Sequence, residues 1–209
     1  MAIPDPTKER LLRIFRILEG ADNDYTSAKL EALTGWPSHT IRKDISCLAK
    51  HELTEDDAER SSAGTFSGYS PRTLVPLIKE ALGLDRRIKF CVAGLGRLGS
   101  AYLNLDSAAL GEFELAAGFD TNVNRVEILK SPVPLYPAHK MGEVIQRFGI
   151  EIALLCVPAE AAQSAAEKLT TAGIRGILNF APAIITVPPE IHVRNVYVRD
   201  ELMALSMNI

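Results

Sequence analysis

The stretch Arg87-Ile-Lys-Phe-Cys-Val-Ala-Gly94-Leu-Gly96-Arg97-Leu-Gly99-Ser-Ala decides how the second half of this 209-residue chain folds. Its apolar run, Ile88–Ala93, predicts a buried strand. The pattern Gly-x-Gly-x-x-Gly follows at once and opens a segment suited to a helix. Gly94 permits the tight turn, Gly96 lets a pyrophosphate approach the backbone, and Gly99 lets the helix pack close to the strand. The stretch therefore predicts a dinucleotide-binding turn.

A carboxylate strengthens this prediction. The run 113–119 is typical of a second strand, and it ends in Asp120 about twenty residues after the glycines, where a carboxylate can accept the ribose hydroxyls. The unpaired N–H groups that open the helix suit a phosphate pair. Since Asp120 would repel a 2′-phosphate, we expect NAD(H) rather than NADP(H). The alternative is a glycine-rich turn that binds nothing.

The rest of this half alternates strands and helices, which predicts a Rossmann-like, doubly wound parallel sheet of the α/β class. We expect a polar turn at 121–125, an extended connection at 131–137, strands at 152–157 and 176–180, and strand segments in the tail. Ligands of such sheets lie beyond the carboxyl ends of the strands. The expected cofactor-binding residues are Gly94, Leu95, Gly96, Arg97, Leu98, Gly99, Asp120, Val157, Pro158, Asn179, Phe180 and Ala181.

The first 85 residues predict helices. Thr7 is expected to cap the first, and Leu30 and Leu33 to face inward from a short second helix that ends before Trp36. Ser38 is expected to cap a third helix. A short helix, a glycine-containing turn and a helix with a basic outer face are typical of a helix-turn-helix, whose second helix enters the DNA major groove. The expected DNA-binding residues are Ser38, His39, Thr40, Arg42, Lys43, Ser46 and Tyr69. The alternative is a three-helix bundle with a solvated basic face.

The segment from 50 to 68 occupies the place of the hairpin in a winged helix. Its acidic run would repel phosphates. A helix is expected to follow, from Ser70-Pro71 to Leu82.

The charge, the cysteines and the residues near the predicted site limit the other functions that the chain could have. The net charge of −3 gives no whole-chain argument for nucleic acid or membrane binding. The three cysteines have no disulfide or metal spacing, and we expect a cytoplasmic protein with no membrane segment and no bound metal. No acid or base stands near the predicted ring end of the dinucleotide, so we expect no enzyme. The alternatives are an NAD-dependent oxidoreductase, or a CoA-binding Rossmann protein, against which Asp120 counts because CoA carries a 3′-phosphate.

Five motifs resemble the Rex family of bacterial redox-sensing transcriptional repressors. They are Thr40-Ile-Arg42-Lys43-Asp44, Gly68-Tyr69, Gly94-Leu-Gly-Arg-Leu-Gly-Ser100, Val157-Pro-Ala-Glu-Ala-Ala-Gln163 and Gly173-Ile-Arg-Gly-Ile-Leu-Asn-Phe-Ala-Pro182. The resemblance implies a homodimer that binds operator DNA and is released by NADH. It implies a winged helix-turn-helix in 1–85, a Rossmann domain in 86–198, and a C-terminal helix, 199–209, exchanged between subunits.

The resemblance also implies that Arg16 takes part in the family's switch. The sequence departs from the family around this residue. Many members have an acidic residue where Tyr197 stands and a tyrosine in the segment where Leu105 stands, and these groups pair with the arginine. The aromatic-rich segment after the recognition helix is replaced by Ile-Ser-Cys-Leu-Ala, residues 45–49. We therefore expect a divergent member.

Overall fold

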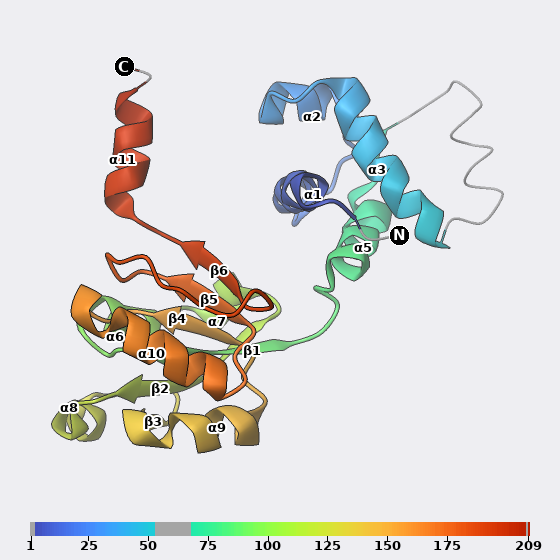
Figure 1. Cartoon of the computed structure of the whole chain (residues 1–209). Coiled ribbons are helices and arrows are strands. Elements are labelled where there is room, and N and C mark those ends of the chain that lie inside the picture. The colour runs from blue at the N-terminus through green and yellow to red at the C-terminus, as the bar shows by residue number, and fades with distance from the viewer. Residues whose placement is uncertain (1–2, 53–67, 208) are drawn as a thin grey trace. The chain divides into compact units, whose positions relative to one another are not determined.

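The computed structural model describes residues 3–52, 68–207 and 209, and the chain divides into two compact units (Figure 1). The first unit is Met1–Arg86, which is helical, and the second is Arg87–Ile209, which contains the sheet. The expected wing, within 50–68, falls almost wholly outside the described residues.

The helical unit contains α1 (Asp5–Leu18), α2 (Ser27–Thr34), α3 (Ser38–Glu52) and α5 (Pro71–Leu82). Apolar residues at helical spacing meet in one core, because each helix turns one face inward. The fully buried members of this core are Leu11, Ile14, Leu18, Leu30, Ile41 and Ile78. The turn between α2 and α3 begins at Gly35, which takes the left-handed conformation (φ +76°) that glycine adopts without strain.

Three local predictions in this unit were wrong. Thr7 does not cap α1, because the helix already begins at Asp5 after Pro4, and Thr7 lies buried within it. Leu33 is 52% exposed, because the two-turn helix α2 presents only Leu30 to the core. Ser38 is itself the first residue of α3, and its hydroxyl donates to the carboxylate of Glu31.

The second unit is built on a six-stranded parallel sheet in the order β3-β2-β1-β4-β5-β6. This is the strand order of the Rossmann fold, so the predicted α/β doubly wound sheet is confirmed. The strands are β1 (Ile88–Ala93), β2 (Phe113–Asp120), β3 (Leu135–Pro137), β4 (Ile152–Leu155), β5 (Gly176–Asn179) and β6 (His192–Asn195).

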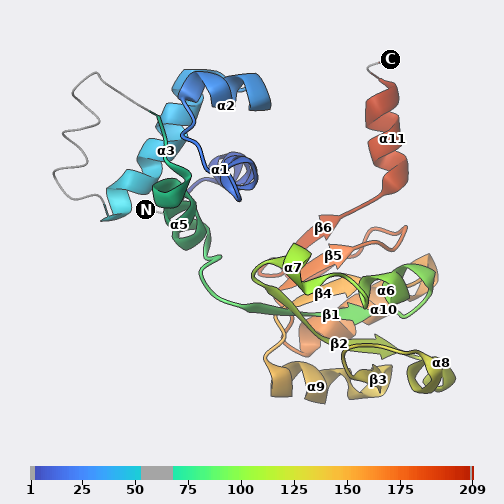
Figure 2. The same ribbon diagram turned by 180° about the vertical axis from the view of Figure 1, so that it is seen from behind.

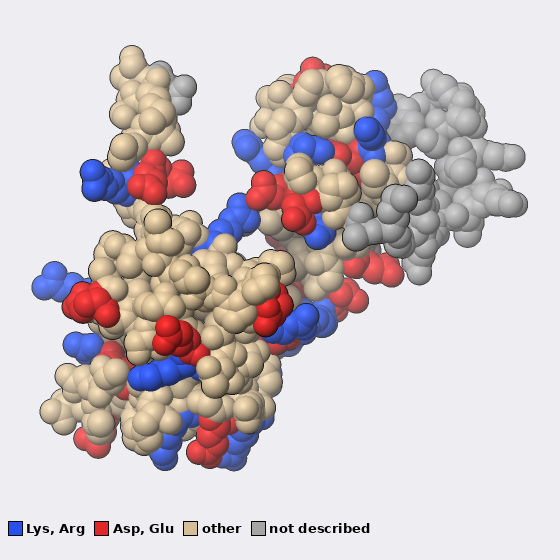
Figure 3. Space-filling model, viewed as in Figure 1, with Lys and Arg blue, Asp and Glu red and all other residues tan. Residues whose placement is uncertain are grey.

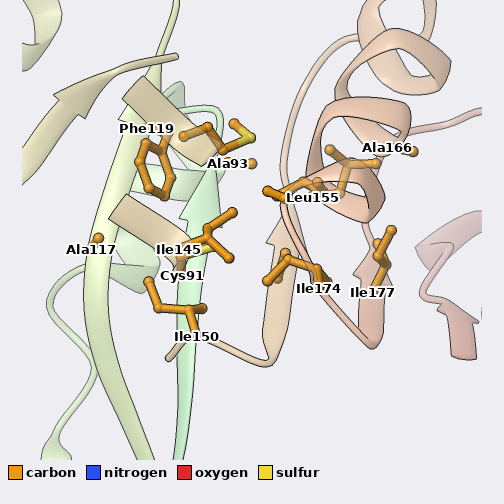
Figure 4. Close-up of a cluster of buried hydrophobic side chains, with 14 of the residues drawn as sticks. Cys91, Ala93, Ala117, Phe119, Ile145, Ile150, Leu155, Ala166, Ile174 and Ile177 are labelled. Carbon is orange, nitrogen blue, oxygen red and sulfur yellow. The ribbon is translucent and has the colours of Figure 1, made fainter. Parts of the chain in front are cut away.

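Helices cover both faces of the sheet (Figures 1 and 2). One face packs Phe119 and Leu155 against Ile145 of α9 and Ala166 of α10, in the cluster shown in Figure 4. The other face packs a second cluster around Phe90. The helices are α6 (Arg97–Tyr102), α7 (Ser107–Leu110), α8 (Val123–Ile128), the 3-10 turn η1 (Ala138–Lys140), α9 (Met141–Phe148), α10 (Ala159–Thr171) and α11 (Val198–Ser206).

Three predictions in this unit were wrong or incomplete. The expected polar turn at 121–125 runs into α8, because the side chain of Asn122 caps that helix by accepting from the N–H of Arg125. The expected extended connection contains β3, which pairs with β2. Of the strand segments expected in the tail, the one over Val196-Tyr-Val does not form, because α11 begins at Val198.

Candidate nucleotide and DNA sites

The glycine turn after β1 is closed by two close backbone approaches. Gly94 has a φ of +95°, and a Cβ there would lie 2.5 Å from the carbonyl oxygen of Cys156. A Cβ on Gly99 would lie 1.8 Å from the carbonyl oxygen of Gly94. A Cβ on Gly96 would meet nothing within 4 Å, so the turn is open to a ligand at this residue. The close approaches at Gly94 and Gly99 and the open space at Gly96 are compatible with the three roles that the spacing predicts.

Asp120 lies buried at the end of β2 and holds the glycine turn. Its Oδ2 accepts from the backbone N–H of Leu95 at 2.7 Å and from Arg125 at 2.9 Å, and its Oδ1 accepts from the N–H of Asn122 at 2.8 Å. Burial raises the pKa of Asp120, but these hydrogen bonds and the charge of Arg125 outweigh burial, so the pKa is below its ordinary value of 3.8. The group is a carboxylate at neutral pH.

Few hydrogen-bond acceptor positions of the Asp120 carboxylate remain for a ligand. A carboxylate oxygen accepts about two hydrogen bonds, so Oδ2 is filled and Oδ1 keeps one free position. One ribose hydroxyl fits that position. Capture of both hydroxyls, as the sequence predicted, would require the guanidinium of Arg125 to move.

A cavity of about 800 Å³ joins the ends of β1, β2, β4 and β5. This volume lies within the range of small-molecule sites. Eight of the twelve predicted cofactor residues line it: Gly94, Gly96, Arg97, Leu98, Asp120, Val157, Pro158 and Phe180. The other four, Leu95, Gly99, Asn179 and Ala181, do not line it.

Asn179 and Ala181 instead support the wall of the cavity. Both are fully buried, and the Oδ1 of Asn179 accepts from the N–H of Ala181 at 3.0 Å. The Nδ2 of Asn179 donates to the carbonyl of Ala183 at 2.9 Å. Between them Phe180 faces the cavity, with its ring centroid 5.0 Å from that of Tyr102.

Sequence reasoning missed further lining residues, which include Thr121, Arg125, Cys156, Ser164 and Lys168. Arg125 and Lys168 add positive charge at a site expected to hold a pyrophosphate. A basic residue five positions after the strand-ending Asp120 was the only sequence signal for Arg125. Burial raises the pKa of the Cys156 thiol to about 12, so this sulfur lines the cavity as a neutral thiol.

In the helical unit, the predicted DNA-reading helix presents a polar outer face. His39, Arg42, Lys43 and Ser46 are exposed on α3, and Ser38 and Thr40 add to the same polar sequence. The guanidinium of Arg42 donates to the hydroxyl of Ser27 at 3.1 Å. On the face seen in Figure 3, basic and acidic side chains are interspersed.

A partly buried ion pair fixes α3 against α1. Asp44 of α3 accepts from Nε and Nη2 of Arg10, the latter at 2.8 Å, and from the hydroxyl of Thr7 at 3.2 Å. Its side chain is 4% exposed, so removal of Arg10 would leave an uncompensated buried carboxylate. The pair therefore sets the position from which the outer face of α3 is presented.

Two other predicted residues, Tyr69 and Arg16, differ in their exposure to solvent. Tyr69 is buried in the helical core, where its backbone forms an antiparallel bridge with Tyr25. The structure therefore places it beneath the surface on which the other expected DNA-binding residues lie. Arg16 is exposed on α1.

Two further classes of site find no support among the residues that the structure describes. No group of three or more His, Cys, Asp or Glu side chains there is placed to hold a metal ion. No helix in the same part of the chain has the length and apolar character needed to cross a membrane.

A helix-turn-helix unit joined to a Rossmann unit with a nucleotide-sized cavity defines a class, that of ligand-responsive DNA-binding regulators. Comparison with curated proteins specifies the family. The chain is 36% identical to the redox-sensing transcriptional repressor Rex of Thermus thermophilus, over 100% of this chain and 95% of the relative. It is 33% identical to the Rex of Levilactobacillus brevis, over 97% and 92%. The chain belongs to the Rex family of redox-sensing transcriptional repressors, whose members are named as repressors and not as enzymes.

Solved structures agree over the whole chain. RSP, a Rex-family repressor, aligns with a TM-score of 0.80 and 28% identity, covering 100% of this chain and 94% of its own. RSP has also been solved with β-NADH, and with β-NAD⁺ and operator DNA, each with a TM-score of 0.80 and 27% identity. The sequence model of the CoA binding domain family matches residues 85–183.

Proposed function

We propose that this chain is a transcriptional repressor that binds operator DNA through α3 and NAD(H) in the cavity beside Asp120, and that NADH releases it from DNA. The observation that carries the proposal is the pairing, in one Rex-family chain, of an exposed polar face on α3 with an open Gly96 turn beside a buried carboxylate. Because operator DNA is the proposed partner, a cytoplasmic location is part of the proposal.

The proposed cofactor-binding residues are the eight that line the cavity. The pyrophosphate would lie against the turn at Gly96, with the adenosine ribose next to Asp120 and the nicotinamide ring toward Val157 and Phe180. The other four predicted residues do not line the cavity, and we propose that they support the residues that do; they are Leu95, Gly99, Asn179 and Ala181. The relatives of this family are named as repressors and not as enzymes, which suits binding of the redox pair without turnover.

The proposed DNA-binding residues are Ser38, His39, Thr40, Arg42, Lys43 and Ser46, and the buried Tyr69 is left out of this set. We also propose a homodimer, in which the exposed apolar residues of α11 are covered by the partner subunit. Val198, Leu202 and Leu205 are 71%, 60% and 63% exposed, and apolar residues in such numbers on a short helix favour a protein contact. Arg16 is the proposed switch residue.

The test compares the affinity for operator DNA in the presence of NAD⁺ with the affinity in the presence of NADH. Operator DNA would first be selected from a random duplex pool with NAD⁺ present. Fluorescence anisotropy would then give the affinity for that duplex with saturating NAD⁺ and with saturating NADH. We expect NADH to weaken binding by about 5- to 150-fold, the usual range of allosteric coupling. Equal affinities would refute redox sensing.

The match to the CoA binding domain family favours a second ligand candidate, coenzyme A. The buried Asp120 opposes it, because a ribose phosphate would approach a carboxylate. Competition with NADH fluorescence distinguishes the two ligands. We expect micromolar CoA to leave bound NADH in place.

A further inference from the structure

We propose that Arg125 is a specificity-determining residue, whose guanidinium competes with the ribose hydroxyls of NAD(H) for the carboxylate of Asp120 and offers a positive charge to a 2′-phosphate. Arg125 thereby narrows the preference for NADH over NADPH that Asp120 creates. The inference rests on the proposed NAD(H) site and concerns the adenosine end of that site.

The guanidinium of Arg125 takes up an acceptor position that a ribose hydroxyl needs. Its Nη1 donates to the Oδ2 of Asp120 at 2.9 Å, and both residues line the cavity. Because Oδ2 also accepts from the N–H of Leu95, this oxygen is filled while the ion pair lasts. The Oδ1 atom accepts from the N–H of Asn122 and keeps one position. A ribose diol presents two hydroxyls, so it competes with Arg125 for the second position.

Arg125 can leave Asp120 without a change in the backbone. The other two donors are the backbone N–H groups of Leu95, in the glycine turn, and of Asn122, before α8, so their departure would reshape the chain. The side chain of Arg125 is 44% exposed, and none of the residues of α8 is buried. The backbone N–H of Arg125 is held by the side chain of Asn122. Rotation of the Arg125 side chain is therefore enough to free the carboxylate.

The released guanidinium has a partner when the ribose carries a 2′-phosphate. A buried carboxylate alone would repel such a phosphate. A guanidinium can instead bind it through two parallel hydrogen bonds. Arg125 therefore acts in one direction on both nucleotides, since it weakens the binding of a free diol and strengthens the binding of a phosphorylated one. The other charged residues that line the cavity are Arg97, Glu160 and Lys168.

The test is Arg125→Met, which keeps an unbranched side chain and removes the charge and the donor. Titration calorimetry would give the Kd of NADH, of NADPH and of the NADH analogue that contains 2′-deoxyadenosine. We expect the ratio of the NADPH Kd to the NADH Kd to rise at least about fivefold, because Asp120 then faces the 2′-phosphate alone.

The analogue measures the competition for Asp120 directly. In the wild-type protein the guanidinium returns to Asp120 when the 2′-hydroxyl is missing, so the loss of the hydroxyl is partly compensated. In Arg125→Met this compensation is absent. The ratio of the analogue's Kd to the NADH Kd should therefore rise at least about threefold. All three ligands carry the same pyrophosphate, so a general loss of positive charge near it cancels in both ratios.

Two further variants separate specificity from a merely structural role. Arg175→Met is the matched control, because Arg175 pairs with Glu151 at 3.8 Å in the same unit and does not line the cavity. It should leave both ratios within about twofold of wild type. Arg125→Lys keeps the charge and a donor beside Asp120, and should retain ratios close to those of wild type. A structural role of Arg125 would shift the melting temperature and all three affinities together, with both ratios unchanged.

The outcomes distinguish the failure of this inference from the failure of the proposed function. A wild-type protein that binds no NADH would refute the proposed function. Wild-type NADH binding with both ratios unchanged in Arg125→Met would overturn the role of Arg125 alone, and so would equal changes in Arg175→Met. If Arg125→Met does not fold, the ion pair is structural, and the inference is overturned because it requires the folded chain to tolerate the departure of Arg125 from Asp120.

Discussion

The carboxylate of Asp120 accepts a hydrogen bond from the backbone N–H of Leu95 at 2.7 Å, which ties the end of β2 to the glycine turn after β1. One side chain thus both shapes the turn and faces the ribose position. The two roles are coupled, because the turn can keep its shape only while Asp120 remains a hydrogen-bond acceptor.

Asp120→Asn tests both roles. The amide group has one acceptor oxygen where three donors converge, so the variant should lose about 1–3 kcal/mol of stability. NADH affinity should fall about tenfold, equivalent to ~1.4 kcal/mol. NADPH affinity should fall less, because the repulsion of its 2′-phosphate disappears. Titration calorimetry with both nucleotides measures this change. NADPH binding as tight as NADH binding in the wild-type protein would contradict a discriminating Asp120.

Acid should weaken the Rossmann unit through the same group. The pKa of Asp120 is lower in the folded chain than its ordinary value of 3.8, despite burial, because Asn122, Leu95 and Arg125 bond the charged form. The resulting stabilisation is present above about pH 4–5 and is lost as the pH falls through the folded pKa. Melting temperatures between about pH 6 and pH 3 should fall more steeply for the wild-type protein than for Asp120→Asn. Parallel curves would show that another carboxylate dominates.

Substitutions at two glycines of the turn should affect different properties, because Gly99 is needed for folding and Gly96 for the binding of NADH. Gly99→Ala places a methyl group 1.8 Å from a backbone oxygen that cannot move freely, and should cost about 1–3 kcal/mol or more. Gly96→Ala has open space, so its stability should stay within about 0.5 kcal/mol of wild type. NADH affinity should nevertheless fall at least about tenfold, because the added methyl group occupies the approach of the pyrophosphate.

Gly142→Ala is the control for these two variants. Gly142 lies within α9, and a Cβ added there would meet nothing within 4 Å, so alanine should raise stability by about 0.5–1 kcal/mol and leave NADH binding unchanged. Thermal melts and NADH fluorescence measure all three proteins. Normal NADH binding by Gly96→Ala would place the pyrophosphate elsewhere.

The sequence predicted the central sheet well because its signals are continuous. Buried strands such as β1 and β4 are unbroken or nearly unbroken apolar runs, and the glycine spacing allows few other structures. The short elements α8 and β3 were missed, since six and three residues carry too little periodicity. Their formation depends on the Asn122 cap and on pairing with β2, which no local pattern reveals.

The candidate site was predictable in outline and not in detail. Asp120 follows from its distance to the glycines, but Arg125 reaches it only because α8 forms. Asn179 was expected to contact the cofactor, because it ends a strand beside the site. The structure instead uses its amide to satisfy the backbone of the following loop, the usual requirement for a fully buried polar group.

The last prediction concerns the DNA contacts of α3. Arg42 and Lys43 are exposed, and Arg42 is oriented by the hydroxyl of Ser27, a geometry suited to phosphate contact. Arg42→Ala and Lys43→Ala should each weaken operator binding and reduce the slope of log affinity against log salt by about one, because each removes one phosphate neutralisation. Anisotropy titrations between about 50 and 200 mM salt measure this slope.

Lys140→Ala, an exposed lysine of the Rossmann unit, is the matched control for lost charge and should leave the slope unchanged. All three variants should bind NADH normally, because none of these side chains lines the nucleotide cavity. A slope that stays at the wild-type value in both α3 variants would mean that α3 does not face the phosphates. The polar face of α3 would then be a solvated surface, the alternative that its sequence left open.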